Sequence, residues 1–175
     1  MSTVANPNAA NTTNQLVVGV ADYKVTKDPN AILVTHALGS CIGVTVYDPA
    51  ARVGGMLHFM LSSSKNAKTK AEEKPAMFAD TGVPMLFKDA YKLGAKKENL
   101  IVCAAGGAEI LGDCECFKIG SRNRTILRKI FWKNEILIAA EDTGGTKSRT
   151  LQMNMSDGSI EIRSQGERTP LWPSD

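Results

Sequence analysis

Long apolar runs and aromatic side chains are both scarce in this sequence of 175 residues. No apolar stretch approaches the roughly 20 residues that a membrane-spanning helix needs. The polar segment MSTVANPNAANTTNQ has no apolar core of a signal peptide. We therefore expect a cytoplasmic protein without membrane insertion. The net charge is only +3, and no dense basic stretch is interleaved with aromatics, so nucleic acid is not an expected partner.

Cysteine and histidine are also few, at four and two residues. In the cytosol cysteines are normally thiols rather than disulfides. Cys114 and Cys116 form one isolated Cys-x-Cys, whereas zinc sites usually draw four ligands from paired clusters. Gly106 and Gly107 lack the Lys-Ser/Thr of a P-loop and the spacing of a dinucleotide fingerprint. We therefore expect no metal and no cofactor, and the roles of Cys103, Cys114 and Cys116 stay open.

The length suits one domain with a sizeable core. Composition predicts a flexible arm over residues 1–14, a single folded domain over 15–165 and a loose tail over 166–175. The expected strands are 31–35, 42–47, 55–61, 100–105 and 136–140, followed by a hairpin of 150–155 with 159–163. Two helices are expected, from about 80 to 93 and from 122 to 133, the second with Ser121 as N-cap. Residues 62–74 are expected to form a mobile loop.

Cys41 follows a Gly-Ser turn at the start of a predicted strand. The backbone N–H groups of Ser40 and Cys41 could form an oxyanion site there. His58 lies in the next strand, on one face with Met56 and Met60, and consecutive strands are often paired. A histidine could take the proton of the thiol, as cysteine nucleophiles require. The alternatives are a small buried cysteine and a hydrogen-bonded core histidine.

A third group should orient the imidazole. Thr35 ends the strand before the Gly-Ser turn, and its hydroxyl can bond to a ring nitrogen. His36 is the adjacent alternative. Because neighbours in an extended strand point to opposite faces, only one of the two can join Cys41. Simple β-propensity is the competing explanation for Thr35.

Five segments, taken together in order and spacing, resemble the CheD family of chemoreceptor glutamine deamidases. They are VTHALGSCIGVTVYDP, GGMLHFML, AAGGAEIL, IGSRNRTIL and AEDTGG. In that family a cysteine, a histidine and a threonine form the active site, and they fall on Cys41, His58 and Thr35. The resemblance implies an α+β fold in which a mixed β-sheet sandwich is flanked by helices. His36-Ala37, Ser62 and Ala105 depart from the family pattern, away from the three catalytic positions.

The resemblance also implies a reaction and partners. The reaction is hydrolysis of glutamine side chains to glutamate on the cytoplasmic helices of chemoreceptors, through a cysteine thioester. A methylesterase side activity is compatible with the same thioester. The alternative function is a non-catalytic module that binds and stimulates a CheC-type phosphatase, and a cysteine peptidase is a second rival.

Overall fold

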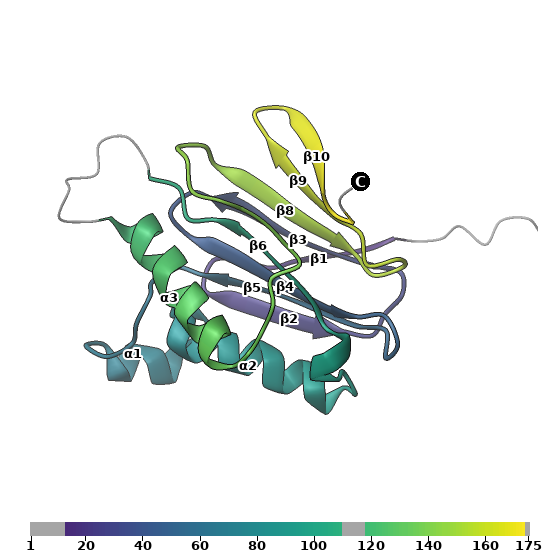
Figure 1. Ribbon diagram of the computed structural model, residues 1–175, viewed down its shortest axis with the longest axis horizontal. Coiled ribbons are helices and arrows are strands. Elements are labelled where there is room, and N and C mark those ends of the chain that lie inside the picture. Colours follow the sequence, from purple (N-terminus) through teal and green to yellow (C-terminus); the bar gives the residue numbers. More distant parts are fainter. Residues whose placement is uncertain (1–12, 110–117, 174–175) are drawn as a thin grey trace, which may run out of the picture.

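Two five-stranded β-sheets stack face to face, and helices cover the outer face of one of them (Figure 1). A computed structural model describes residues 13–109 and 118–173 of the chain. Each sheet contains one parallel strand pair among antiparallel ones, so both are mixed. This arrangement confirms the α+β class expected from the resemblance. No helix in the described residues is long and apolar enough to cross a membrane.

The first four strands along the chain alternate between the two sheets, the next three stay in the sheet of the fourth, and the last three lie in the other sheet. Sheet A has the order β1 (Asn14–Val17), β3 (Ala31–Leu38), β8 (Arg149–Asn154), β9 (Ile160–Ser164) and β10 (Glu167–Trp172). Sheet B has the order β2 (Asp22–Thr26), β5 (Val53–Phe59), β4 (Ile42–Asp48), β6 (Ile101–Gly106) and β7 (Ala140–Thr143). The helices are α1 (Lys68–Glu73), α2 (Ala79–Lys92) and α3 (Ile119–Lys133), with 3-10 turns at Pro75–Met77 and Lys97–Asn99.

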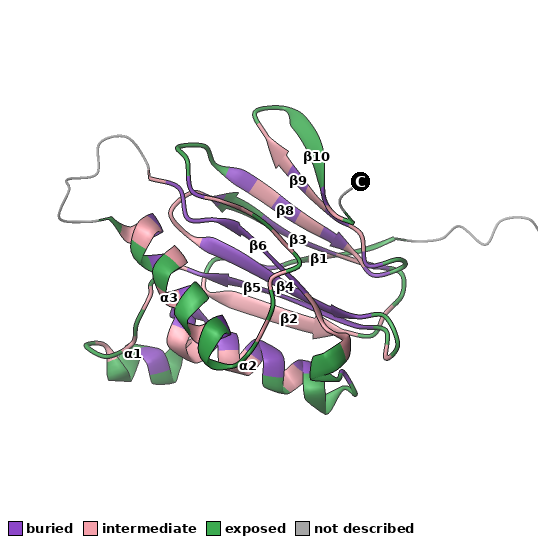
Figure 2. Ribbon diagram, in the orientation of Figure 1, coloured by how far each residue is buried: buried purple, intermediate pink, exposed green. Residues whose placement is uncertain are grey.

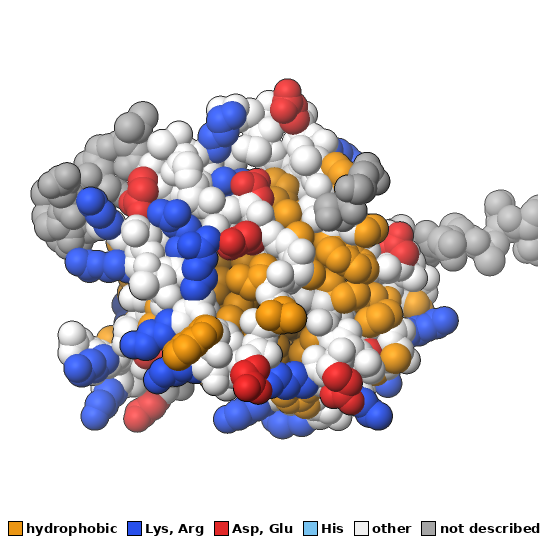
Figure 3. Space-filling model, viewed as in Figure 1, with side chains coloured by type: hydrophobic (Ala, Val, Ile, Leu, Met, Phe, Trp, Pro, Cys, Tyr) orange, Lys and Arg blue, Asp and Glu red, His pale blue; other side chains and the backbone are white. Residues whose placement is uncertain are grey.

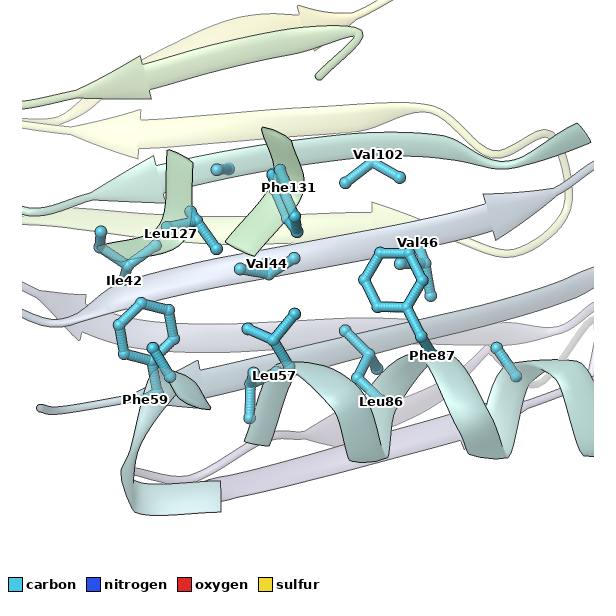
Figure 4. Packing of buried hydrophobic residues seen from close by; sticks show 14 of the residues in the cluster. Ile42, Val44, Val46, Leu57, Phe59, Leu86, Phe87, Val102, Leu127 and Phe131 are labelled. Atoms are coloured by element: carbon cyan, nitrogen blue, oxygen red, sulfur yellow. The ribbon is translucent and has the colours of Figure 1, made fainter. Parts of the chain in front are cut away.

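The side-chain alternation of β4 and β5 creates two separate core layers. Every residue of both strands is buried, which makes them the centre of the molecule (Figure 2). One face packs against the helices. It joins β4 and β5 to α2 and α3 through side chains that include Ile42, Val44, Leu57, Phe59, Leu86, Phe87, Leu127 and Phe131 (Figure 4). The opposite face packs against sheet A, and the candidate catalytic residues lie in that layer.

Gly43 allows the two sheets to approach closely at one end of this layer. A Cβ atom at Gly43 would lie 2.9 Å from Leu151 Cδ2 and 3.5 Å from Thr35 Cγ2, both in sheet A. A larger residue would therefore push sheet A away from sheet B. The glycine thus brings Thr35 of one sheet within reach of side chains on the other.

The C-terminal segment differs from the sequence prediction, because residues expected to be a loose tail form strand β10. Gln165 and Gly166 both adopt positive φ, at 52° and 83°, and reverse the chain after β9. Leu171 is buried in the layer between the sheets and Trp172 packs beside it. Pro170 is tolerated because β10 is an edge strand, with a register shift next to the proline.

Smaller differences concern one short helix and the ends of other elements. The segment predicted as a loop at 62–74 contains the short helix α1. Helix α3 begins at Ile119 after Lys118, so the predicted cap at Ser121 is wrong. The strand predicted at 136–140 is shifted, since β7 begins only at Ala140. Residues 1–12 of the expected arm, and Cys114 with Cys116, lie outside the described residues.

Candidate active site

The layer between the sheets brings Cys41 and His58 to the same face of sheet B. Gly43 pairs directly with His58 across β4 and β5. Cys41 lies two residues before Gly43 and packs against the same inter-sheet cluster that contains Met56. It is therefore a diagonal neighbour of His58, and such neighbours have Cβ atoms within about 7–8 Å, in reach of long side chains. Strand pairing thus accounts for the proximity of a thiol and an imidazole.

Thr35 reaches His58 from the opposite sheet. Its Oγ1 lies 2.7 Å from His58 Nδ1 and 2.7 Å from the Val18 carbonyl oxygen. The carbonyl can only accept, so the single hydroxyl proton of Thr35 is directed to Val18. The hydroxyl oxygen must then accept from His58, which places the ring proton on Nδ1. The free lone pair of His58 is therefore on Nε2, the form required of a base.

The unpaired nitrogen of His58 is buried. His58 is 0% exposed, and its Nε2 has no hydrogen-bond partner in the described part of the chain. Burial lowers the pKa of His58 from 6.5 to about 4, so the ring is neutral at physiological pH. Cys41 Sγ does not hydrogen-bond to Nε2 in this conformation, and catalytic hydrogen bonds are often longer before substrate binds. A buried lone pair without a donor is unusual in a folded protein and is typical of a functional group.

Cys41 is half-buried at the mouth of the same layer. Burial raises the pKa of its thiol, and its own backbone N–H partly counteracts this effect. At neutral pH the resting pair is therefore a thiol beside a neutral imidazole, not a preformed ion pair. If this thiol acts as a nucleophile, proton transfer to the imidazole has to accompany the attack rather than precede it.

His36, the alternative to Thr35, is directed away from His58. Its side chain is exposed, and its Nδ1 lies 3.3 Å from Thr150 Oγ1. The next residue, Ala37, has a positive φ of 57°, and the pairing register shifts between Thr35 and Leu38. Of the two candidates, Thr35 is the one in contact with His58.

Sequence reasoning gave no role to the glycines after β6 or to Asn123 on α3, yet both contact the Cys41 turn. Gly107 N–H donates to the Cys41 carbonyl at 2.8 Å. Gly106, at φ 111°, passes so close to this carbonyl that a Cβ atom would collide with it. Asn123 Nδ2 donates to the Ser40 carbonyl at 2.9 Å. The signals in the sequence were the glycine pair, which marks a close backbone approach, and the family segment IGSRNRTIL, which contains Asn123.

Comparison with known proteins supports the resemblance seen in the sequence. The model of the CheD family, described as CheD chemotactic sensory transduction, matches residues 60–164. "Probable chemoreceptor glutamine deamidase CheD 1" of Syntrophus aciditrophicus is 48% identical over 151 residues, which cover 86% of this chain and 94% of the relative.

Two further relatives match a similar share of the chain. "Probable chemoreceptor glutamine deamidase CheD" of Solibacter usitatus is 46% identical over 160 residues, covering 91% of this chain and 95% of the relative. The protein with that name in Pyrococcus horikoshii is 38% identical over 151 residues, covering 85% of this chain and 91% of the relative. These alignments span nearly the full length of the relatives at well over 30% identity. The chain belongs to the CheD family.

Proposed function

We propose that the chain deamidates specific glutamine side chains of chemoreceptors, with Cys41 as nucleophile, His58 as general base and Thr35 as the group that orients His58. The observation that carries this proposal is the hydrogen bond from His58 Nδ1 to Thr35, which leaves Nε2 as a free base beside the Cys41 turn. The relatives named as chemoreceptor glutamine deamidases support the choice of substrate. Receptor glutamines lie in the cytoplasm in this scheme, which is where the chain would act.

The first half of the reaction forms a thioester. His58 Nε2 takes the proton of Cys41 as the sulfur attacks the carboxamide carbon of glutamine. The N–H groups of Ser40 and Cys41 hold the developing oxyanion, because neither donates to a backbone carbonyl in the described part of the chain. The tetrahedral species collapses, the C–N bond breaks, and His58 returns the proton to the leaving ammonia. A glutamyl thioester on Cys41 remains.

The second half releases glutamate. Water loses a proton to His58 Nε2 and attacks the thioester, and the C–S bond breaks. The thiol of Cys41 recovers the proton from His58. The net change is one water consumed and one ammonia released, without any oxidant or cofactor. A glutamyl methyl ester could enter the same thioester, so methylesterase activity would use the same residues.

The perturbed pKa values of the pair make the resting enzyme unreactive. The pKa of His58 is lowered and that of Cys41 is raised, each by burial. Transfer of the proton is therefore uphill until the oxyanion donors stabilise the product of attack. Such a thiol resists alkylation and oxidation at neutral pH, yet reacts when a carboxamide is held against it.

The test is ammonia release from a purified cytoplasmic receptor fragment. Active protein should raise the mass of the intact fragment by about one dalton per modified glutamine, the NH₂-to-OH exchange of this chemistry. Cleaved fragments would indicate a peptidase instead. No ammonia from any receptor fragment would refute the proposed activity. Stimulation of a CheC-type phosphatase, the second role implied by the family, would need a surface rather than the thiol and should survive Cys41→Ala.

A further inference from the structure

Asn123 connects the segment that carries the nucleophile to the segment that carries the base. Its side chain is completely buried, and Nδ2 donates to the Ser40 carbonyl at 2.9 Å and to the Met60 carbonyl at 2.8 Å. Both partners are acceptors, so the amide nitrogen must face them. Ser40 immediately precedes Cys41, and Met60 follows His58 by two residues. One side chain thus fixes the distance between the two catalytic segments.

Asn123 is the one polar side chain on the buried face of α3. The outward side of α3 is basic, with exposed Arg128, Lys129 and Lys133 (Figure 3). The buried stripe consists of Gly120, Asn123, Leu127 and Phe131, spaced as one helical face. Asparagine is a weak helix former and is costly to bury without partners. The two carbonyl groups satisfy its Nδ2, whereas its Oδ1 has no hydrogen-bond partner in the described part of the chain.

The donors that surround the turn all lie on one side of it. Ala108 N–H donates to the Gly39 carbonyl at 2.9 Å, Asn123 to that of Ser40, and Gly107 N–H to that of Cys41 at 2.8 Å. Three successive carbonyls therefore face the β6–α3 segment.

This orientation decides where the N–H groups of the turn point. In a trans peptide unit the C=O and the N–H point in opposite directions, and the only cis peptide in the described residues is Trp172-Pro173. The N–H of Ser40 shares a unit with the Gly39 carbonyl, and the N–H of Cys41 shares one with the Ser40 carbonyl. Both N–H groups are therefore turned away from the donors, toward the free side of the turn.

We infer that Asn123 is a positioning residue for the deamidation proposed above: by binding the Ser40 carbonyl it aims the Cys41 N–H at the oxyanion, and by binding the Met60 carbonyl it holds the turn beside the His58 strand. The inference rests on the proposed function. Asn123 touches no substrate and acts only through the Ser40–Cys41 peptide. The same peptide unit supplies the oxyanion donor on one side and the Asn123 acceptor on the other.

The first turn of α3 is itself bound to this region, and these contacts hold Asn123 in position. Ser121 N–H donates to Glu109 Oε1 at 2.7 Å. Gly120 lies against the carbonyls of Gly107 and Ala108, where a side chain would collide with them. The loop that binds the Gly39 and Cys41 carbonyls and the helix that binds the Ser40 carbonyl are therefore one packed unit.

The experiment compares Asn123→Asp and Asn123→Ala in the full chain with the wild type. Aspartate keeps the shape but lacks the N–H donors. Asn134→Asp is the matched control, because Asn134 lies at the other end of α3 and its Nδ2 caps only the exposed Ile130 carbonyl. The readouts are kcat and KM with a receptor fragment, and iodoacetamide labelling of Cys41 and Cys103 at alkaline pH.

We expect both Asn123 variants to lose about 100-fold in kcat, as when one oxyanion donor is lost, with KM within twofold of wild type. Labelling of Cys41 should be unchanged and Cys103 should stay protected, while Asn134→Asp keeps the wild-type kcat. A kcat within threefold of wild type would overturn the inference. A loss of kcat accompanied by labelling of Cys103 would also overturn it, because the variant would then be unfolded. An inactive wild type would instead refute the proposed function, independently of Asn123.

Discussion

Two cysteines lie in the same core layer and differ in their surroundings rather than in their burial alone. Cys103 is in the middle of β6, between Thr45 of β4 and Ala140 of β7, and is 0% exposed. Burial raises its pKa to about 11. Cys41 is at the open end of the layer, and burial raises its pKa as well. Burial raises the pKa of both thiols, so a lowered pKa does not distinguish the two cysteines.

The difference lies in the polar groups that each sulfur can use. Cys41 has an imidazole with an unpaired nitrogen on the same face of the sheet, and neither Ser40 nor Cys41 donates its N–H to a backbone carbonyl in the described part of the chain. Cys103 lies in regular strand pairing on both sides, and its polar neighbours are the Thr45 hydroxyl and the Ala140 backbone rather than an imidazole. The comparison indicates that strand ends, where backbone donors are free, are the places where a buried thiol can become a nucleophile.

Replacing each cysteine with alanine in turn is the strongest test of this comparison. Cys41→Ala should reduce ammonia release from a receptor fragment to the uncatalysed level, because no thioester can form. Cys103→Ala should keep kcat within about twofold of wild type. Activity that survives in Cys41→Ala, or is lost in folded Cys103→Ala, would contradict the assignment.

Removing the base should have the next largest effect. General-base catalysis typically contributes about 10²–10⁴-fold, so His58→Gln should lower kcat by roughly that amount at neutral pH. The loss should shrink as pH rises toward the raised pKa of Cys41, since the thiolate then forms without a base. A pH–rate profile of both proteins measures this convergence. Parallel profiles would show that His58 is not the proton acceptor.

The sequence predicted the pairing of Cys41 and His58 for a physical reason. His58 lies in β5 and Cys41 immediately precedes β4, and the observed register of these adjacent strands, Gly43 opposite His58, follows from a short local turn. Thr35 was harder to assign, because it comes from the other sheet and its candidacy rested mainly on the family resemblance. Only the packing of the two sheets at Gly43 brings its hydroxyl to His58.

The contacts of Asn123 could not have been predicted from local pattern. They join residues 63 and 83 positions apart, and depend on how α3 packs against the end of sheet B. Strand β10 was missed because Pro170 suggests a loose chain, whereas an edge strand needs no N–H there. Helix α1 has only six residues and too little apolar periodicity to be recognised.

Thr35 offers a smaller change within the same site. Thr35→Val keeps the shape but leaves His58 Nδ1–H and the Val18 carbonyl without their present partner. We expect kcat to fall about 10- to 100-fold and the protein to lose about 1–3 kcal/mol of stability. Thr35→Ser retains the hydroxyl and should stay within a few-fold of wild type. Nitrogen NMR of His58 should show the Nδ1–H tautomer in wild type and Thr35→Ser. Equal rates for the valine and serine variants would rule out the orienting role.

The last prediction concerns stability rather than rate, and uses the two histidines in place of the two cysteines. The pKa of His58 is about 4 in the folded chain and about 6.5 in the unfolded chain. Between these values the unfolded state binds a proton that the folded state does not, so the free energy of unfolding decreases as pH falls from 6.5 to 4. The shift corresponds to at most about 3.5 kcal/mol, at roughly 1.4 kcal/mol per pKa unit. Urea unfolding across this range should therefore give a flatter pH dependence for His58→Gln than for wild type. His36→Gln, which alters an exposed histidine, should keep the wild-type slope, and an equal slope in all three proteins would mean that His58 is not held neutral by burial.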